Sequence, residues 1–126
     1  PLPPSQLRFY QRAGMPNDRI DRMWKAMRAD PFTPPEPRSF IRLREHDHIN
    51  IGGRRWEVKI GQGHSPEHAC LYSAADQILI AGDQLLPRIS SNVLVTAIEP
   101  EANPLELWLS SLVALDALAE KRRTKA

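Results

Sequence analysis

Residues 51–61 of the chain read Ile-Gly-Gly-Arg-Arg-Trp-Glu-Val-Lys-Ile-Gly, and this stretch has the clearest strand pattern in the chain. Apolar and polar side chains alternate through its second half, which places Trp56, Val58 and Ile60 on one face of a strand. The Gly-Gly pair near its start is typical of the tight turns that join antiparallel strands. The stretch therefore predicts a β-hairpin with one buried face.

Short apolar or alternating runs extend this sheet on both sides. We expect strands at residues 40–43 and 48–51 before the Gly-Gly turn, and at 69–72 and 77–81 after the hairpin. A Ser-Ala-Ala-Asp turn separates the last two strands, which predicts a second, buried hairpin. These runs together favour a mixed or antiparallel sheet within residues 40–97.

Helical periodicity appears before and after the sheet region. A first helix is expected around Leu7, with Gly14 in the position of a C-cap glycine. A second helix carries an apolar stripe at 3.6-residue spacing that consists of Ile20, Met23, Trp24 and Met27. Residues 31–37, Pro-Phe-Thr-Pro-Pro-Glu-Pro, predict a loop, because proline lacks the backbone donor that a helix needs.

A last helix is expected at residues 103–121, with Asn103 as its N-cap and Pro104 at its first position. Its apolar side chains are expected to share one face: Leu105, Trp108, Leu109, Leu112, Leu115 and Leu118. With helices on both sides of a sheet region, the fold class is predicted to be α/β.

The composition limits the classes of function. The chain has 126 residues, of which 41% are hydrophobic and 25% charged, as in an ordinary globular domain. No apolar run approaches the roughly 18 residues of a membrane-spanning helix. The net charge of +2 is a weak argument for binding nucleic acid. The single cysteine, Cys70, cannot form an internal disulfide, which favours a reducing, cytoplasmic location.

Residues 61–68, Gly-Gln-Gly-His-Ser-Pro-Glu-His, form the sharpest local motif. The glycines allow a tight turn and the proline fixes the exit of the chain, so His64 is expected at a strand end. Histidine is a common zinc ligand, although an exposed loop histidine would give the same local pattern.

A carboxylate follows the next predicted strand pair. Asp83 comes directly after the apolar run 78–81, at an edge of the sheet where α/β proteins place their sites. An Asp that only bonds to its own turn would look the same. Because both strands belong to one sheet, we expect His64 and Asp83 to converge in space.

Three other features favour structural roles. His46 and His48 have the His-x-His spacing of some metal sites, but they precede an ordinary strand and are interpreted as an exposed turn or strand start. Cys70 is predicted to be a small buried residue and not a nucleophile. The basic run at 121–125 is interpreted as a solvated helix end that complements the helix dipole.

These segments together resemble the metallo-β-lactamase-fold hydrolases, and in particular their glyoxalase II-like branch. The resemblance rests on residues 51–58, on Gly-His-Ser-Pro-x-His at 63–68, and on Ile-Ala-Gly-Asp-x-Leu-Leu-Pro-Arg-Ile at 80–89. It spans approximately residues 7–118 and covers only the C-terminal part of that domain, so it implies a partial αββα sandwich. The chain begins Pro-Leu-Pro-Pro, without Met or an apolar signal segment, and is interpreted as a piece of a longer protein.

The resemblance also implies how residues 1–126 are organised as a single partial domain. Residues 1–38 correspond to a helical insertion and the Pro-rich loop. Residues 39–97 form the sheet with its metal-ligand loops, and residues 103–121 form the C-terminal helix.

By the same resemblance, His64 and Asp83 are metal ligands, with Asp83 bridging two zinc ions, and His68 supports the site. The family's leading motif, His-x-His-x-Asp-His, is absent from this chain, as is its closing Gly-His-Gly segment. The loop also departs from the family pattern at three positions: Gln62, Glu67 and Gln84. The chain therefore has no complete catalytic set and is expected to bind zinc weakly or not at all.

The implied parent protein is a metal-dependent hydrolase that activates water against an ester, thioester, lactone or similar small molecule. The alternative is a non-catalytic interaction module that keeps the fold without metals. Because the missing part of the domain would cover apolar strands, this chain is expected to self-associate or form a homo-oligomer. Neither a membrane nor a nucleic acid is expected as a partner.

Overall fold

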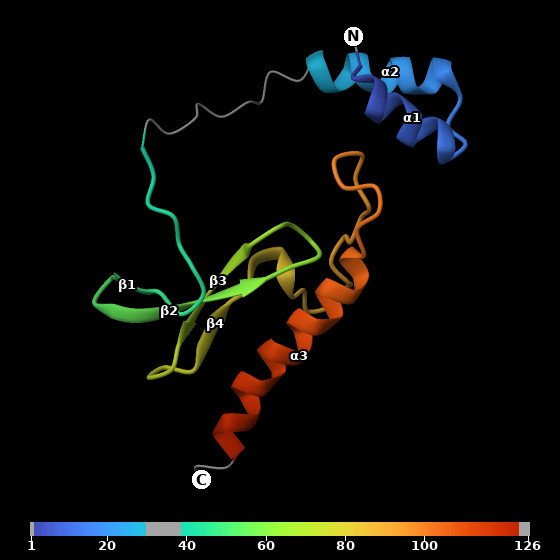
Figure 1. Ribbon diagram of the computed structural model, residues 1–126. Coiled ribbons are helices and arrows are strands. Elements are labelled where there is room, and N and C mark those ends of the chain that lie inside the picture. Colours follow the sequence, from blue (N-terminus) through green and yellow to red (C-terminus); the bar gives the residue numbers. More distant parts are fainter. Residues whose placement is uncertain (1, 30–38, 124–126) are drawn as a thin grey trace. The chain divides into compact units, whose positions relative to one another are not determined.

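The computed structural model describes residues 2–29 and 39–123 (Figure 1). The predicted Pro-rich loop at 31–37 lies outside the described residues, as do the side chains of the basic run at 121–125. Within the described ranges the protein is α/β, with a four-stranded antiparallel sheet and with helices before and after it along the chain, as the sequence predicts.

The chain divides into two compact units. The first, called here the helical unit, comprises Pro1–Phe40 and Val95–Ala102. The second, called the sheet unit, comprises Ile41–Leu94 and Asn103–Ala126.

The sheet unit has one antiparallel meander, in the order β1-β2-β3-β4 (Figure 1). Its strands are β1 (His48–Ile51), β2 (Arg54–Gly61), β3 (His68–Ser73) and β4 (Ile78–Ile80). Gly52 and Gly53 join β1 to β2 with positive φ angles of 60° and 74°, the conformation that a tight two-residue turn requires. The hairpins predicted from the sequence are therefore confirmed.

The buried apolar residues of the sheet unit come from β2, β3 and the last helix. Trp56 and Val58 are buried on one face of β2, in agreement with the predicted alternation. Cys70 on β3 is completely buried, and burial raises the pKa of its thiol, so it is the inert small residue expected from the sequence. Leu115 is also buried, and it belongs to α3 (Pro104–Arg123), which packs on β2.

The helix α3 begins as predicted. The Oδ1 atom of Asn103 accepts a hydrogen bond from the Glu106 amide at 3.2 Å, and the Glu106 carboxylate accepts one from the Asn103 side chain at 2.9 Å. The predicted apolar face is wrong in part, because Leu105 and Leu109 are about half exposed. The side of α3 that contacts β2 includes Ser111, whose small hydroxyl the apolar pattern does not show.

The strand predicted at 40–43 does not form. Phe40 and Ile41 are exposed at 81% and 90%. The reason is that the backbone groups of β2 beyond the end of β1 already have hydrogen-bond partners, so residues 40–43 cannot pair with them. The backbone of His46 donates to Val58 O, and Val58 N donates to Asp47 O, so a turn occupies that part of the edge.

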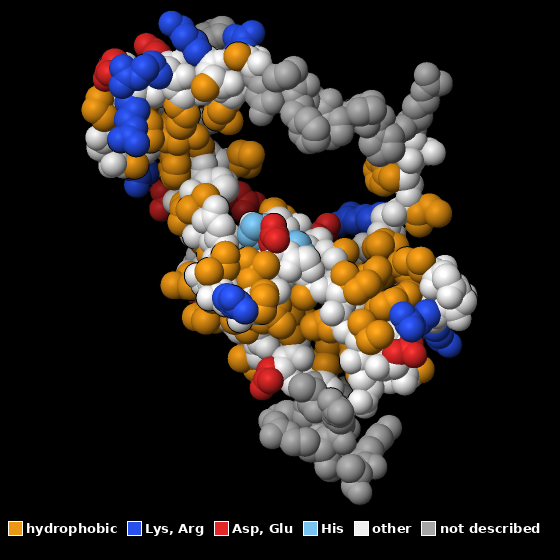
Figure 2. Space-filling model, turned by 180° about the vertical axis from the view of Figure 1, so that it is seen from behind, with side chains coloured by type: hydrophobic (Ala, Val, Ile, Leu, Met, Phe, Trp, Pro, Cys, Tyr) orange, Lys and Arg blue, Asp and Glu red, His pale blue; other side chains and the backbone are white. Residues whose placement is uncertain are grey.

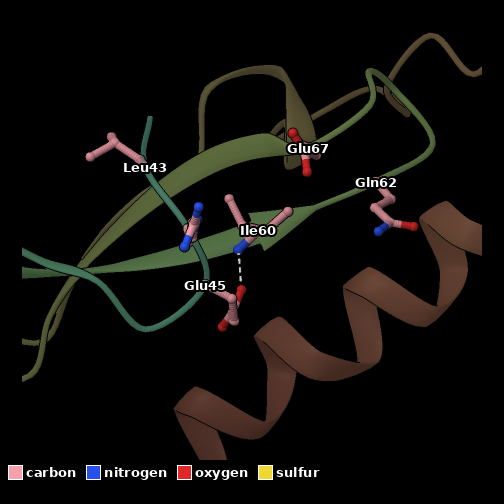
Figure 3. Close-up of a pocket in the computed structure, with 6 residues that line it drawn as sticks. Leu43, Glu45, Ile60, Gln62 and Glu67 are labelled. Carbon is pink, nitrogen blue, oxygen red and sulfur yellow. Dashed lines mark hydrogen bonds between the residues drawn. The ribbon is translucent and has the colours of Figure 1, made fainter. Parts of the chain in front are cut away.

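Side chains cap the rest of this edge. The amide of Ile60 donates to the Glu45 carboxylate (Figure 3), and the amide of Gln62 donates to Ser111 Oγ at 2.9 Å. A pocket of about 330 Å³ lies along this edge and is lined by Leu43, Arg44, Glu45, Ile60, Gln62 and Glu67. The outward amides of Val58 and Ile60 in β2, and that of Gln62 directly after it, thus each have a partner without an added strand.

The His-x-His segment has the structural role that its sequence context favours. His46 lies in a turn with φ 68°, and His48 is the first, exposed residue of β1. His46 Nδ1 contacts Glu57 Oε1 at 2.8 Å, and Lys59 Nζ lies 2.6 Å from the same oxygen. The hydrogen bond with His46, followed by that with Lys59, lowers the pKa of Glu57 to about 2.

The helical unit contains α1 (Pro4–Arg12) and α2 (Asn17–Ala29). Gly14 follows α1 with φ 78°, as its predicted position after the helix requires. Ile20 is completely buried, and Arg12 lies 3.3 Å from Glu101 in an exposed ion pair.

Hydrophobic side chains are widespread on the surface of the sheet unit (Figure 2). Along α3, Leu105, Leu109 and Val113 follow one another at four-residue spacing and are 54%, 50% and 72% exposed. On β4, Ile78 and Ile80 are also exposed, so the expected burial of the second hairpin is wrong for this strand.

None of the helices within residues 2–29 and 39–123 combines the length and the apolar character that crossing a membrane requires.

The Glu57 cluster predicts acid sensitivity. Since the pKa of Glu57 is lowered from 4.5 to about 2, its contribution to stability is complete above pH 5 and declines as the pH falls towards 2. Glu57→Gln should therefore cost about 1–2 kcal/mol of unfolding free energy at pH 7 and much less at pH 2.5. Urea titrations at both pH values measure this, with Glu99→Gln as an exposed control. An equal loss at both pH values would contradict the assignment.

The exposed stripe on α3 predicts self-association. At tens of micromolar the chain should sediment above its monomer mass of 14.3 kDa, because dimerisation would remove this apolar surface from water. Val113→Glu should shift the distribution towards monomer. Ala26→Glu, which adds the same charge to an exposed position of α2, should not. A wild-type monomer at these concentrations would show that the stripe does not self-associate.

Candidate metal-ligand site

The loop at 61–68 is held where β2 meets the start of α3. A Cβ atom at Gly63 would lie 2.5 Å from Trp108 Cβ, and the φ angle of this glycine is 94°. A Cβ atom at Gly61 would lie 2.6 Å from Gln84 Cγ. Position 63 therefore requires glycine, whereas a side chain at position 61 would have to displace the side chain of Gln84. The chain turns closely past α3 and presents the next residue, His64.

The ring of His64 is fixed by one nitrogen. Its Nδ1 atom lies 2.9 Å from the backbone oxygen of Asn92, which can only accept a hydrogen bond, so Nδ1 carries the proton. In the neutral ring Nε2 then has a free electron pair. Orientation of a histidine through a backbone carbonyl on its far nitrogen is the arrangement typical of metal ligands.

Asp83 lies directly opposite. It belongs to the short 3₁₀ helix η1 (Gly82–Gln84), and its Oδ2 atom is 3.7 Å from His64 Nε2. The Asp83 side chain is 67% exposed, whereas that of His64 is 25% exposed. The expected convergence of the two residues is thus found in the sheet unit.

The two atoms face a pocket of about 370 Å³. It is lined by His64, Asp83, Leu86, Ile89, Ser90, Ser91 and Asn92. An imidazole nitrogen and a carboxylate oxygen are the right donor types for zinc. Zinc–ligand bonds of about 2.0–2.1 Å place two ligand atoms of a tetrahedral ion about 3.3 Å apart, which is close to the distance observed here.

The pair does not make a complete site. A catalytic zinc ion takes three protein ligands, and no cluster of three or more suitable His, Cys, Asp or Glu side chains exists within residues 2–29 and 39–123. The residues present therefore fit a metal in kind and separation, but supply only part of its ligands.

Gln84 stabilises both loops. Its side chain is completely buried, and its Nε2 atom donates to Gln62 O at 3.0 Å. Its backbone oxygen accepts from Trp108 Nε1 and from Ser91 Oγ, both at 3.2 Å. These contacts connect the loop of His64, the helix η1 and α3.

In the sequence, Gln62 and Gln84 stand out only as departures from a family pattern, and their contact with each other is not foreseen. The sequence signal for Gln84 is its position directly after the candidate ligand Asp83. The orienting contribution of Asn92 had no sequence signal, because any residue supplies a backbone carbonyl.

His68, the third expected site residue, lies next to His64 but has no free ring nitrogen. Its Nδ1 atom is 3.2 Å from Ser65 Oγ and its Nε2 atom is 3.0 Å from Ala81 O. The centroids of the two histidine rings are 5.7 Å apart.

Comparison with known proteins identifies a family whose sequence profile matches almost the whole chain. The sequence profile described as the Metallo-beta-lactamase superfamily matches residues 3–125. Among curated proteins, no relative matches the chain.

Twelve chains of solved structures match this chain, and two of them show the extent of the similarity. One is a beta-lactamase domain protein from Burkholderia ambifaria, with 58% identity and a TM-score of 0.60 over 62% of this chain and 24% of that one. The other is a metallo-beta-lactamase family protein from Thermus thermophilus, with 28% identity and a TM-score of 0.72 over 90% of this chain and 35% of that one. The chain thus spans about a quarter to a third of the length of these structures.

Proposed function

The chain belongs to the metallo-beta-lactamase superfamily, and from this membership we propose that it is the C-terminal, ligand-bearing part of a metal-dependent hydrolase of the glyoxalase II-like branch. The observation that carries the proposal is the 3.7 Å approach of His64 Nε2 to Asp83 Oδ2, with the other nitrogen of the ring already held by a backbone carbonyl.

In this proposal His64 and Asp83 hold the metal. His64 would supply a neutral nitrogen whose direction is set by the Asn92 carbonyl, and Asp83 would supply an exposed carboxylate as the shared ligand of a zinc centre. The metal ions supply Lewis acidity, which makes water nucleophilic near neutral pH. The remaining ligands come from parts of the protein outside this chain, so this chain alone is inactive.

The substrate is an ester, thioester, lactone or similar acyl compound. The residues that line the pocket beside the two ligands include the apolar Leu86 and Ile89 and the polar Ser90 and Asn92. No Lys or Arg is among the described residues that line this pocket, which favours a neutral acyl group over a phosphodiester or nucleic acid. The free, buried thiol of Cys70 suits a cytoplasmic protein.

The alternative is an interaction module without metals, and the missing third ligand among the described residues is the observation that favours it. Calorimetric titration with Zn²⁺ separates the two. If the ligand assignment is right, the chain binds zinc at micromolar affinity or more weakly, because two ligands give only a small part of the roughly 10–16 kcal/mol of a four-ligand site. His64→Ala and Asp83→Asn should each remove this binding.

The control is His46→Ala, which tests zinc uptake by the exposed His46 and His48. Binding that is lost in His46→Ala and kept in His64→Ala would refute the ligand assignment. Sub-micromolar binding lost in His64→Ala would show instead that this chain completes a site by itself.

The longer protein gives the functional test. Asp83→Ala should reduce ester or thioester hydrolysis more than the roughly 10–100-fold expected for a residue beyond the metal's own ligands. The fold should remain, because the Asp83 side chain is mostly exposed. Circular dichroism and thermal unfolding check the fold, and turnover unchanged by the substitution would exclude the bridging role.

A further inference from the structure

His68 joins three separate parts of the candidate site. It is the first residue of β3 and pairs with Gly61, the last residue of β2. One ring nitrogen contacts Ser65 in the loop of His64, and the other contacts Ala81, two residues before Asp83. We propose that His68 is a positioning residue that ties these two segments together and so sets the separation of His64 from Asp83.

The hydrogen-bond partners distinguish this role from that of a ligand. Ala81 O can only accept, so the His68 Nε2 atom carries the proton, and in the neutral ring Nδ1 accepts from the Ser65 hydroxyl. His64 has its proton on the opposite nitrogen, Nδ1, and keeps Nε2 free. The two adjacent histidines therefore have opposite tautomers, and only His64 offers a free electron pair.

Packing around Gly82 supports the proposal that His68 holds the two segments together. A Cβ atom at this position would lie 2.9 Å from His68 Nε2, so the backbone that leads to Asp83 passes directly against the imidazole. Cys70 lies behind the same contact, with its Sγ atom 3.6 Å from Ala81 O and no exposed surface. Loss of the His68–Ala81 hydrogen bond should free the end of β4 and expose this thiol.

The structural part of this inference is independent of any metal, whereas its consequence for ligand separation rests on the proposed function. Cys70 is the single cysteine of the chain, so its rate of reaction with a disulfide reagent such as Ellman's reagent reports local opening. The experiment is done with EDTA present, on the wild type and on folded variants.

His68→Ala should increase the Cys70 labelling rate about tenfold or more. His68→Gln, whose amide can still donate to Ala81 O, should restore most of the protection. Ser65→Ala removes only the second hydrogen bond and should give a smaller increase. His48→Ala, at an exposed position of β1, should leave the rate unchanged.

The dependence of the labelling rate on low urea concentrations separates local from global opening. Local opening at the end of β4 predicts a rate in His68→Ala that is nearly independent of urea. An unchanged labelling rate in folded His68→Ala would overturn the proposal, and so would a steep dependence on urea, because that indicates general destabilisation.

Zinc titration of the same variants tests the consequence for the ligands. His68→Ala should weaken zinc binding by about 10–100-fold or less, and His68→Gln should recover it. Loss as complete as in His64→Ala, without recovery in His68→Gln, would make His68 a ligand and overturn the positioning role. If Asp83→Ala leaves the turnover of the longer protein unchanged but His68→Ala still exposes Cys70, the contact of His68 with both segments stands and the proposed function fails.

Discussion

The candidate site depends on two places where the chain has no side chain. At residues 61 and 63 the backbone passes so close to Gln84 and Trp108 that a Cβ atom has no room. This contact brings the end of β2, the helix η1 and the first turns of α3 into one arrangement. The position of His64 follows from it, because this residue leaves the contact directly towards Asp83.

The sheet therefore directly supports the loop that carries the candidate ligand His64. The β2–β3 register ends at the pair Gly61–His68, so the same ladder that forms the core also defines the base of the ligand loop. The buried amide of Gln84 continues this connection to the next loop. An ion placed between His64 and Asp83 would meet an imidazole that Asn92 already orients, whereas the exposed Asp83 carboxylate would still have to be ordered on binding.

Much of this arrangement could be predicted from the sequence. Alternation and turn glycines predicted the hairpins, and the placement of His64 and Asp83 after strands of one sheet predicted their convergence. The prediction failed at 40–43, since alternation shows that a segment can form a strand but not whether an edge is free to receive it. It failed on α3 for a related reason, because a helix with leucines around its circumference does not reveal which of them pack. Backbone contacts, such as that of Asn92 with His64, leave no trace in residue types.

The capped edge of β2 has a consequence for misfolding. An unpaired strand with alternating apolar residues is a template on which cross-β assemblies can nucleate. Here a charged carboxylate from Glu45 occupies the Ile60 amide, and the Ser111 hydroxyl occupies the next outward amide. An incoming strand would have to displace both and desolvate the carboxylate before it formed its first ladder bonds. Growth of a cross-β assembly from this edge would therefore require the loss of the Glu45–Ile60 hydrogen bond.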